Sequence, residues 1–148
     1  DCLLSRGLGD VYKRQAFMKT GAQLVAEAKA KIQELTVQQL AALLQTSQAR
    51  IIDVREPAEF ATGHIPTAVN MLRGVLEMQL PQHPAVVEHK DAVVALTELA
   101  TQPLYLICRS GARSALAVES LQRMGFRDLY SIAGGMQAWT DSGFPVRQ

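Results

Sequence analysis

The residues with the clearest chemical potential stand in the loop CRSGAR, which covers residues 108–113. Cys108 is followed within five positions by one glycine and two arginines. Positive charge near a cysteine favours the thiolate, which is the nucleophilic form. Gly111 lets the backbone turn tightly, so that the N–H groups of the loop can point inward as a nest for an anion. Cys108 is therefore our candidate nucleophile.

The elements on either side of this loop would place the sulfur at a functional edge. Residues 104–107 (LYLI) form a continuous apolar run, which predicts a buried parallel strand. Residues 114–124 predict a helix, and Gly125 follows its end. Ligands of open α/β sheets bind beyond the carboxyl ends of the strands, and the positive end of a helix attracts anions. Taken alone, each residue has a plainer interpretation: a space-filling buried cysteine, solvated arginines, and helix-capping serines.

Strands and helices alternate along most of the chain. Thr36 and Gln39 form a capping box at the start of one expected helix. The alternation predicts an α/β fold with a mostly parallel sheet. The other expected strands cover residues 50–55, 68–71 and 128–132, and the other expected helices cover residues 23–35, 57–60, 86–100 and 136–141.

Three blocks of sequence, in the right order, resemble a single-domain rhodanese. LYLICRSGARSALAVESLQRMGF resembles the strand, loop and helix of the family's active site. IIDVREPAEFATGHIPTAVNM resembles its opening signature, and DLYSIAGGMQAW its closing signature. The opening block supplies Asp53, Arg55, Glu59, His64 and Pro66, and the closing block supplies Gly134, Gly135 and Trp139. The family often has glycine where Thr67 stands and proline where Leu72 stands, which affects the expected local backbone more than the chemistry.

The resemblance implies a rhodanese-like α/β fold: a central, mostly parallel, five-stranded sheet with helices on both faces. It also implies that Cys108 is the catalytic residue and carries sulfur as a persulfide. Asp53 and Arg55 would support the loop; for Asp53 we favour a structural pairing with Arg55 or a loop amide. Glu59 would brace the loop or lie on the surface. The implied persulfide-binding loop comprises Arg109, Ser110, Gly111, Ala112, Arg113 and Ser114.

The activity implied by the resemblance is sulfur transfer by a ping-pong cycle without a metal or organic cofactor. The sulfur donor would be a small anion, thiosulfate or a persulfide, which Arg109 and Arg113 would attract. The acceptor would be cyanide, a small thiol or a protein cysteine.

Three other functions remain open at this point. A cysteine-dependent phosphatase or arsenate reductase would resemble C-x5-R, whereas the chain has C-x4-R, a smaller ring that suits sulfur better than phosphate. A sulfur relay for one protein partner would show little activity on thiosulfate. A rhodanese-like binding domain typically lacks the cysteine that this chain has.

Composition and length frame these expectations. The chain has 148 residues, which fits one domain, and its net charge of +1 argues against a nucleic-acid partner. It shows no long apolar run and no signal peptide, so we expect no membrane partner and a cytoplasmic location. No cysteine or histidine spacing suits a metal.

Domain organisation is expected to follow three segments. Residues 1–17 contain DVYKRQ, which resembles adapter-derived peptides at the ends of metagenomic gene predictions. We therefore expect residues 1–17 to be a non-native or disordered extension and the natural chain to begin at Met18. An N-terminal helix should occupy residues 18–35, and a rhodanese-like domain residues 36–148.

Overall fold

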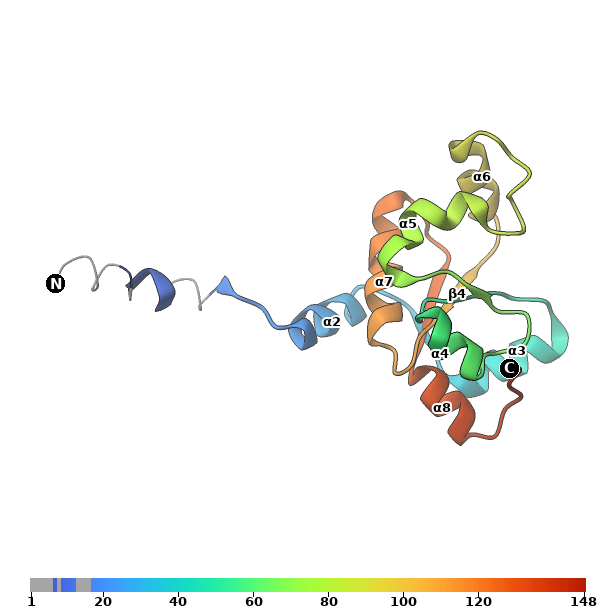
Figure 1. The fold of residues 1–148 in the computed structure, drawn as a ribbon, viewed down its shortest axis with the longest axis horizontal. Helices are drawn as coiled ribbons and strands as arrows, with labels where there is room; N and C mark the ends of the chain where they lie inside the picture. The colour runs from blue at the N-terminus through green and yellow to red at the C-terminus, as the bar shows by residue number, and fades with distance from the viewer. Residues whose placement is uncertain (1–6, 8, 13–16) are drawn as a thin grey trace.

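The computed structural model describes residues 7, 9–12 and 17–148. The expected non-native or disordered extension concerns residues 1–17, most of which lie outside the described residues. From residue 34 onward the chain forms the sheet and the helices that pack against it (Figure 1).

A five-stranded sheet with the order β1-β5-β4-β2-β3 forms the centre of the fold. Every neighbouring pair of strands is parallel, which confirms the expected sheet. The middle strand, β4, is buried along its whole length, as the apolar run LYLI predicts. The strands are β1 (Glu34–Leu35), β2 (Arg50–Asp53), β3 (Val69–Asn70), β4 (Leu104–Ile107) and β5 (Leu129–Ile132).

Helices cover both faces of this sheet, also as expected. Side chains alternate along each strand, so Ile52 and Leu106 face one core while Ile51 and Ile107 face the other. The first core lies under α5 (Leu76–Gln79), α6 (Ala92–Leu99) and α7 (Ala112–Met124). The second lies under α3 (Val37–Thr46) and α8 (Gly135–Asp141). Further elements are α2 (Gly21–Lys29), α4 (Pro57–Thr62) and the short 3₁₀ helices Arg73–Val75 and Leu80–Gln82.

The prediction of a helix over residues 23–35 is wrong at the C-terminal end of this range. Helix α2 ends at Lys29, and Glu34–Leu35 forms the edge strand β1. Backbone N–H groups of Ser131 and Ala133 in and after β5 donate to the carbonyls of Gln33 and Leu35. Pairing with a strand far along the sequence therefore overrides the local helical pattern, and the sheet begins before residue 36.

The helix expected over residues 86–100 is also too long. Helix α6 starts at Ala92, where the carboxylate of Asp91 accepts hydrogen bonds from the N–H groups of Val93 and Val94. This N-cap sets the start of the helix. Val86 is buried instead by a turn that closes on the carbonyl of His83.

Thr67 adopts a left-handed backbone conformation, with φ of 77°. This region favours glycine, because a side chain there crowds its own backbone. The geometry explains why a related chain would carry glycine at this position.

Candidate functional site

Cys108 directly follows the central strand β4 and is 1% exposed. Its backbone leaves the sheet at the carboxyl edge, between β2 and β5. The chain then turns through residues 109–111 into α7. This position is the one at which parallel α/β sheets hold ligands.

Two backbone amides point at the sulfur of Cys108. The N–H of Gly111 donates to Sγ at 3.1 Å, and the N–H of Ser114 donates to it at 3.3 Å. Gly111 has φ of 101°, which turns the loop back over the sulfur and starts α7. Both amides belong to the positive end of this helix of 13 residues. The surroundings of Sγ therefore suit a sulfur anion.

The outer side of the loop is held by the first turn of α8. The N–H of Met136 donates to the carbonyl of Cys108 at 2.8 Å, and the N–H of Gln137 donates to that of Arg109 at 2.9 Å. These bonds turn two loop carbonyls away from the sulfur, so the N–H groups of the loop are free to face inward. Gly135, with φ of 55°, lets α8 approach the loop this closely.

Arg113 forms an ion pair with a carboxylate on α4. Its Nη1 and Nη2 lie 2.8 and 3.0 Å from Oε1 and Oε2 of Glu59, a bidentate ion pair. Hydrogen bonding to Arg113 lowers the pKa of Glu59 to about 2, and the same contact raises the pKa of Arg113. Arg113 thus anchors the loop, and its charge is shared with Glu59 instead of facing a donor alone.

This ion pair predicts a pH dependence of stability. Because the pKa of Glu59 is lowered on folding, its stabilisation is complete above pH 4.5 and is lost as pH falls toward 2. We expect Glu59→Gln to remove this dependence and to cost about 1 kcal/mol or less at neutral pH, because the pair is partly exposed. Urea unfolding of both proteins between pH 7 and pH 2 measures it. Arg113→Gln should have the same effect. If either variant loses unfolding free energy with falling pH as steeply as the wild type does, the dependence does not come from the Glu59–Arg113 pair.

Asp53 and Arg55 form a buried ion pair beside the loop, with Nη2 and Oδ2 2.7 Å apart. Arg55 also donates to the carbonyl of Gly63 at 2.8 Å, and Asn70 donates to the carbonyls of Asp53 and Arg55. These contacts join the end of β2 to α4 and β3. Among the hydrogen bonds of the described residues, the side chains of Asp53 and Arg55 make none to residues 108–114, and Glu59 makes the direct contact.

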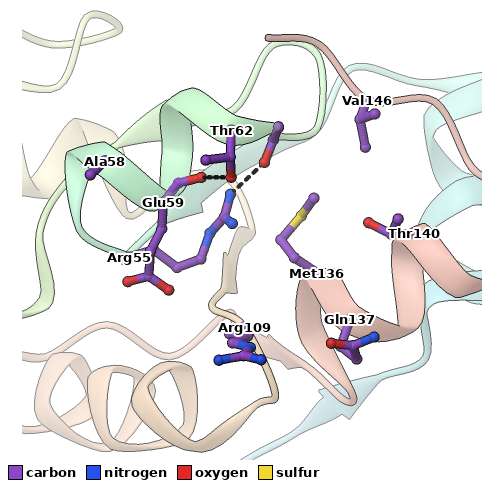
Figure 2. Close-up of a pocket in the computed structure, with 10 residues that line it drawn as sticks. Arg55, Ala58, Glu59, Thr62, Arg109, Met136, Gln137, Thr140 and Val146 are labelled. Atoms are coloured by element: carbon purple, nitrogen blue, oxygen red, sulfur yellow. Dashed lines mark hydrogen bonds between the residues drawn. The ribbon is translucent and has the colours of Figure 1, made fainter.

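A pocket of about 600 Å³ opens beside the loop (Figure 2). Arg109 is exposed at its edge, and within the described residues its guanidinium takes part in no ion pair. Ser110 is exposed, and Ala112 is half-buried. The pocket is lined by Arg55, Ala58, Glu59, Thr62, Gly63, Arg109, Met136, Gln137, Thr140 and Val146.

The structure adds contacts that the sequence did not suggest. The hydroxyl of Ser131 lies 2.7 Å from that of Ser114 underneath Cys108. The first-turn amides of α8 hold the loop. In the sequence, the contact between α8 and the loop is indicated by Gly134 and Gly135 alone, because paired glycines often mark close approaches of the backbone.

The family model of the rhodanese-like domain matches residues 36–142. The chain belongs to the rhodanese-like family. Its rhodanese segment contains β2 to β5, the Cys108 loop and the helix α8 that holds it.

Several curated relatives of this chain carry names from sulfur chemistry. A sulfurtransferase of Allochromatium vinosum is 30% identical over 104 residues, which cover 70% of this chain and 83% of the relative. The thiosulfate sulfurtransferase GlpE of Vibrio cholerae is 26% identical, over 71% of this chain and 85% of GlpE. The putative sulfur carrier protein YrkF of Bacillus subtilis is 26% identical over 84% of this chain, which spans 60% of YrkF.

Solved structures show the same fold. A Staphylococcus aureus rhodanese-like domain protein is 28% identical, with a TM-score of 0.61 over 79% of this chain and all of its own. RPA3614 of Rhodopseudomonas palustris, a protein of unknown function described as a possible tyrosine phosphatase, is 30% identical. Its TM-score is 0.73, over 88% of this chain and 96% of its own.

None of the helices in the described part of this rhodanese has the length and apolar character required to span a membrane.

Proposed function

We propose that this rhodanese transfers sulfane sulfur through a persulfide on Cys108. The observation that carries the proposal is the pair of amides on Sγ, from Gly111 at 3.1 Å and Ser114 at 3.3 Å. Backbone donors aimed at a buried sulfur stabilise an anion there, whether thiolate or persulfide. The sulfur-related names of three relatives support the same chemistry.

The cycle has two displacements on sulfur. The Cys108 thiolate attacks the outer sulfur of thiosulfate; its S–S bond breaks, and sulfite leaves with the bonding electron pair. Cys108 then carries a terminal sulfur anion. In the second step a nucleophile such as cyanide or a thiolate attacks that terminal sulfur, and the Cys108 thiolate is the leaving group, so the enzyme returns to its starting state.

The adjoining pocket suits an anionic donor and a larger acceptor. Arg109 supplies positive charge at the pocket edge, while Arg113 is already paired with Glu59. Cys108 is 1% exposed, so a donor that presents a single terminal sulfur fits its surroundings best. The volume of about 600 Å³ also accommodates a thiol acceptor or the tip of a protein loop that presents a cysteine.

We expect Arg109→Gln to raise the KM for thiosulfate about tenfold and to change kcat less than about threefold, because the charge contributes to binding outside the reacting sulfur. Steady-state kinetics with thiosulfate and cyanide measures both constants. Arg123→Gln is the matched control, since Arg123 is an exposed residue in the last turn of α7, at the opposite end of that helix from Cys108, and does not line the pocket. Equal KM values for the wild type and Arg109→Gln would show that Arg109 makes no donor contact.

Phosphoryl transfer is the second candidate, because the structurally similar RPA3614 is described as a possible tyrosine phosphatase. The loop favours sulfur: C-x4-R gives a smaller ring than C-x5-R, and Arg113 is bound to Glu59. Assays of thiosulfate and an aryl phosphate on the same preparation separate the two. Turnover of thiosulfate alone supports the proposal, and turnover of the phosphate alone would replace it.

A further inference from the structure

Ser131 is a buried polar residue to which the proposed cycle assigns no role. It lies on β5 with 0% exposure, and its backbone is paired with Glu34 on one side and Leu106 on the other. Its Oγ is 2.7 Å from Oγ of Ser114, which is 3.4 Å from Sγ of Cys108. The three side chains form a continuous hydrogen-bonded chain that leads from the sulfur to the interior of the sheet.

We propose that Ser131 is a positioning residue that stabilises the anionic form of Cys108 by acting through Ser114. In the thiol form, the S–H of Cys108 donates to the oxygen of Ser114. When that proton leaves to solvent, Ser114 can turn its hydroxyl hydrogen toward the sulfur anion. Its oxygen then accepts the hydroxyl hydrogen of Ser131, and both hydroxyl hydrogens of the chain have acceptors.

Two physical effects make the second serine matter. Donation from Ser131 polarises the Ser114 hydroxyl and strengthens its bond to the sulfur, as expected for linked hydrogen bonds in a buried site. Ser131 also keeps Ser114 from bonding to a carbonyl of its own helix, an alternative that serines in helices commonly use. Because β5 is paired on both sides, the Ser131 hydroxyl approaches from a fixed direction.

Charged groups on several elements lie around the Cys108 loop. None of them belongs to Ser131 or Ser114, so neutral substitutions in the serine chain leave these charges in place. They come from the loop, the start of α7, the end of β2 and α4, and comprise Arg109, Arg113, Asp53, Arg55 and Glu59.

The test is the pH midpoint of thiolate formation, measured by the ultraviolet absorbance of the full chain. The spectrum of the matching Cys108→Ser protein is subtracted each time, which removes the contribution of Cys2. We expect Ser131→Ala to shift the midpoint upward by about half a pH unit. At a pH below the midpoint, this shift lowers the fraction of thiolate about threefold. Ser131→Thr, which keeps the hydroxyl, should retain the wild-type midpoint.

Ser120→Ala is the matched control. Ser120 is a buried serine of α7 whose hydroxyl bonds to Glu77, away from the sulfur. Its loss should leave the midpoint unchanged, whereas a shift equal to that of Ser131→Ala would assign the effect to general destabilisation and overturn the proposal.

A double-mutant cycle tests the route through Ser114. In a Ser114→Ala background, replacing Ser131 with alanine should add no further shift, because its path to the sulfur is already lost. Additive shifts, or an unchanged midpoint in Ser131→Ala, would overturn the proposal; if Ser131→Ala does not fold, Ser131→Val, compared with its isostere Ser131→Thr, takes its place in the cycle. The proposal rests on Cys108 being the reactive group, but the absorbance needs no sulfur transfer, so its failure is distinct from that of the proposed function.

Discussion

Replacement of Cys108 by serine is expected to lower the rate of sulfur transfer by at least about a thousandfold, since no covalent sulfur intermediate can form. A hydroxyl is far less ionised than a thiol at neutral pH and does not form the required S–S bond. Serine is nearly isosteric with cysteine, and the amides of Gly111 and Ser114 can donate to its oxygen as they do to Sγ. The fold should therefore survive.

Thiosulfate-to-cyanide turnover and thermal unfolding of the same preparation measure these two expectations. Cys2→Ser is the matched control and should retain full turnover. A Cys108→Ser protein that folds and still turns over at a rate near the wild type would remove Cys108 from the mechanism.

Gly135→Ala is expected to have the second largest effect, because α8 touches the loop at this residue. A Cβ at residue 135 would lie 2.4 Å from the carbonyl oxygen of Cys108 and 2.6 Å from the carbonyl carbon and oxygen of Arg109. These are backbone atoms, so α8 or the loop must move. The bonds from Met136 and Gln137 to the loop carbonyls would then be lost.

We expect this variant to lose about 2–4 kcal/mol of unfolding free energy, from backbone strain and two broken buried hydrogen bonds. Turnover should fall about a hundredfold, since a shift of the loop moves the amides away from Sγ. Gly143→Ala is the matched control: its φ is also positive, at 76°, but a Cβ there meets nothing within 4 Å. If Gly135→Ala matches this control in both urea unfolding and turnover, α8 does not hold the loop.

The strand, loop and helix around Cys108 could be predicted because their signals are local. The apolar run of β4, Gly111 and the amphipathic α7 follow one another within a single stretch of sequence. The sulfur's place at the carboxyl edge of a parallel sheet follows from that order.

Contacts between distant segments were harder to predict. Glu59 and Arg113 are separated by 54 positions, and bracing of the loop was only one of two expectations for Glu59. The two-residue strand β1 carries no strand pattern of its own and exists because β5 offers it a parallel edge. Its helix-like sequence explains the wrong expectation for residues 30–35.

The hydrogen bond between Ser114 and Ser131 was also not predictable, although the two residues are closer in sequence. Serine near a helix start predicts capping, and serine within a strand predicts nothing specific. Only the packing of α7 on β5 brings the two hydroxyls to 2.7 Å beneath Cys108.

The central claim is that the amide-lined sulfur of Cys108 carries a second sulfur atom. Mass spectrometry of the full-length protein after incubation with thiosulfate tests this most directly. We predict a gain of about 32 Da, located on the peptide that contains Cys108 and removed by cyanide. An unchanged mass for that peptide, in a protein that consumes thiosulfate, would contradict the account.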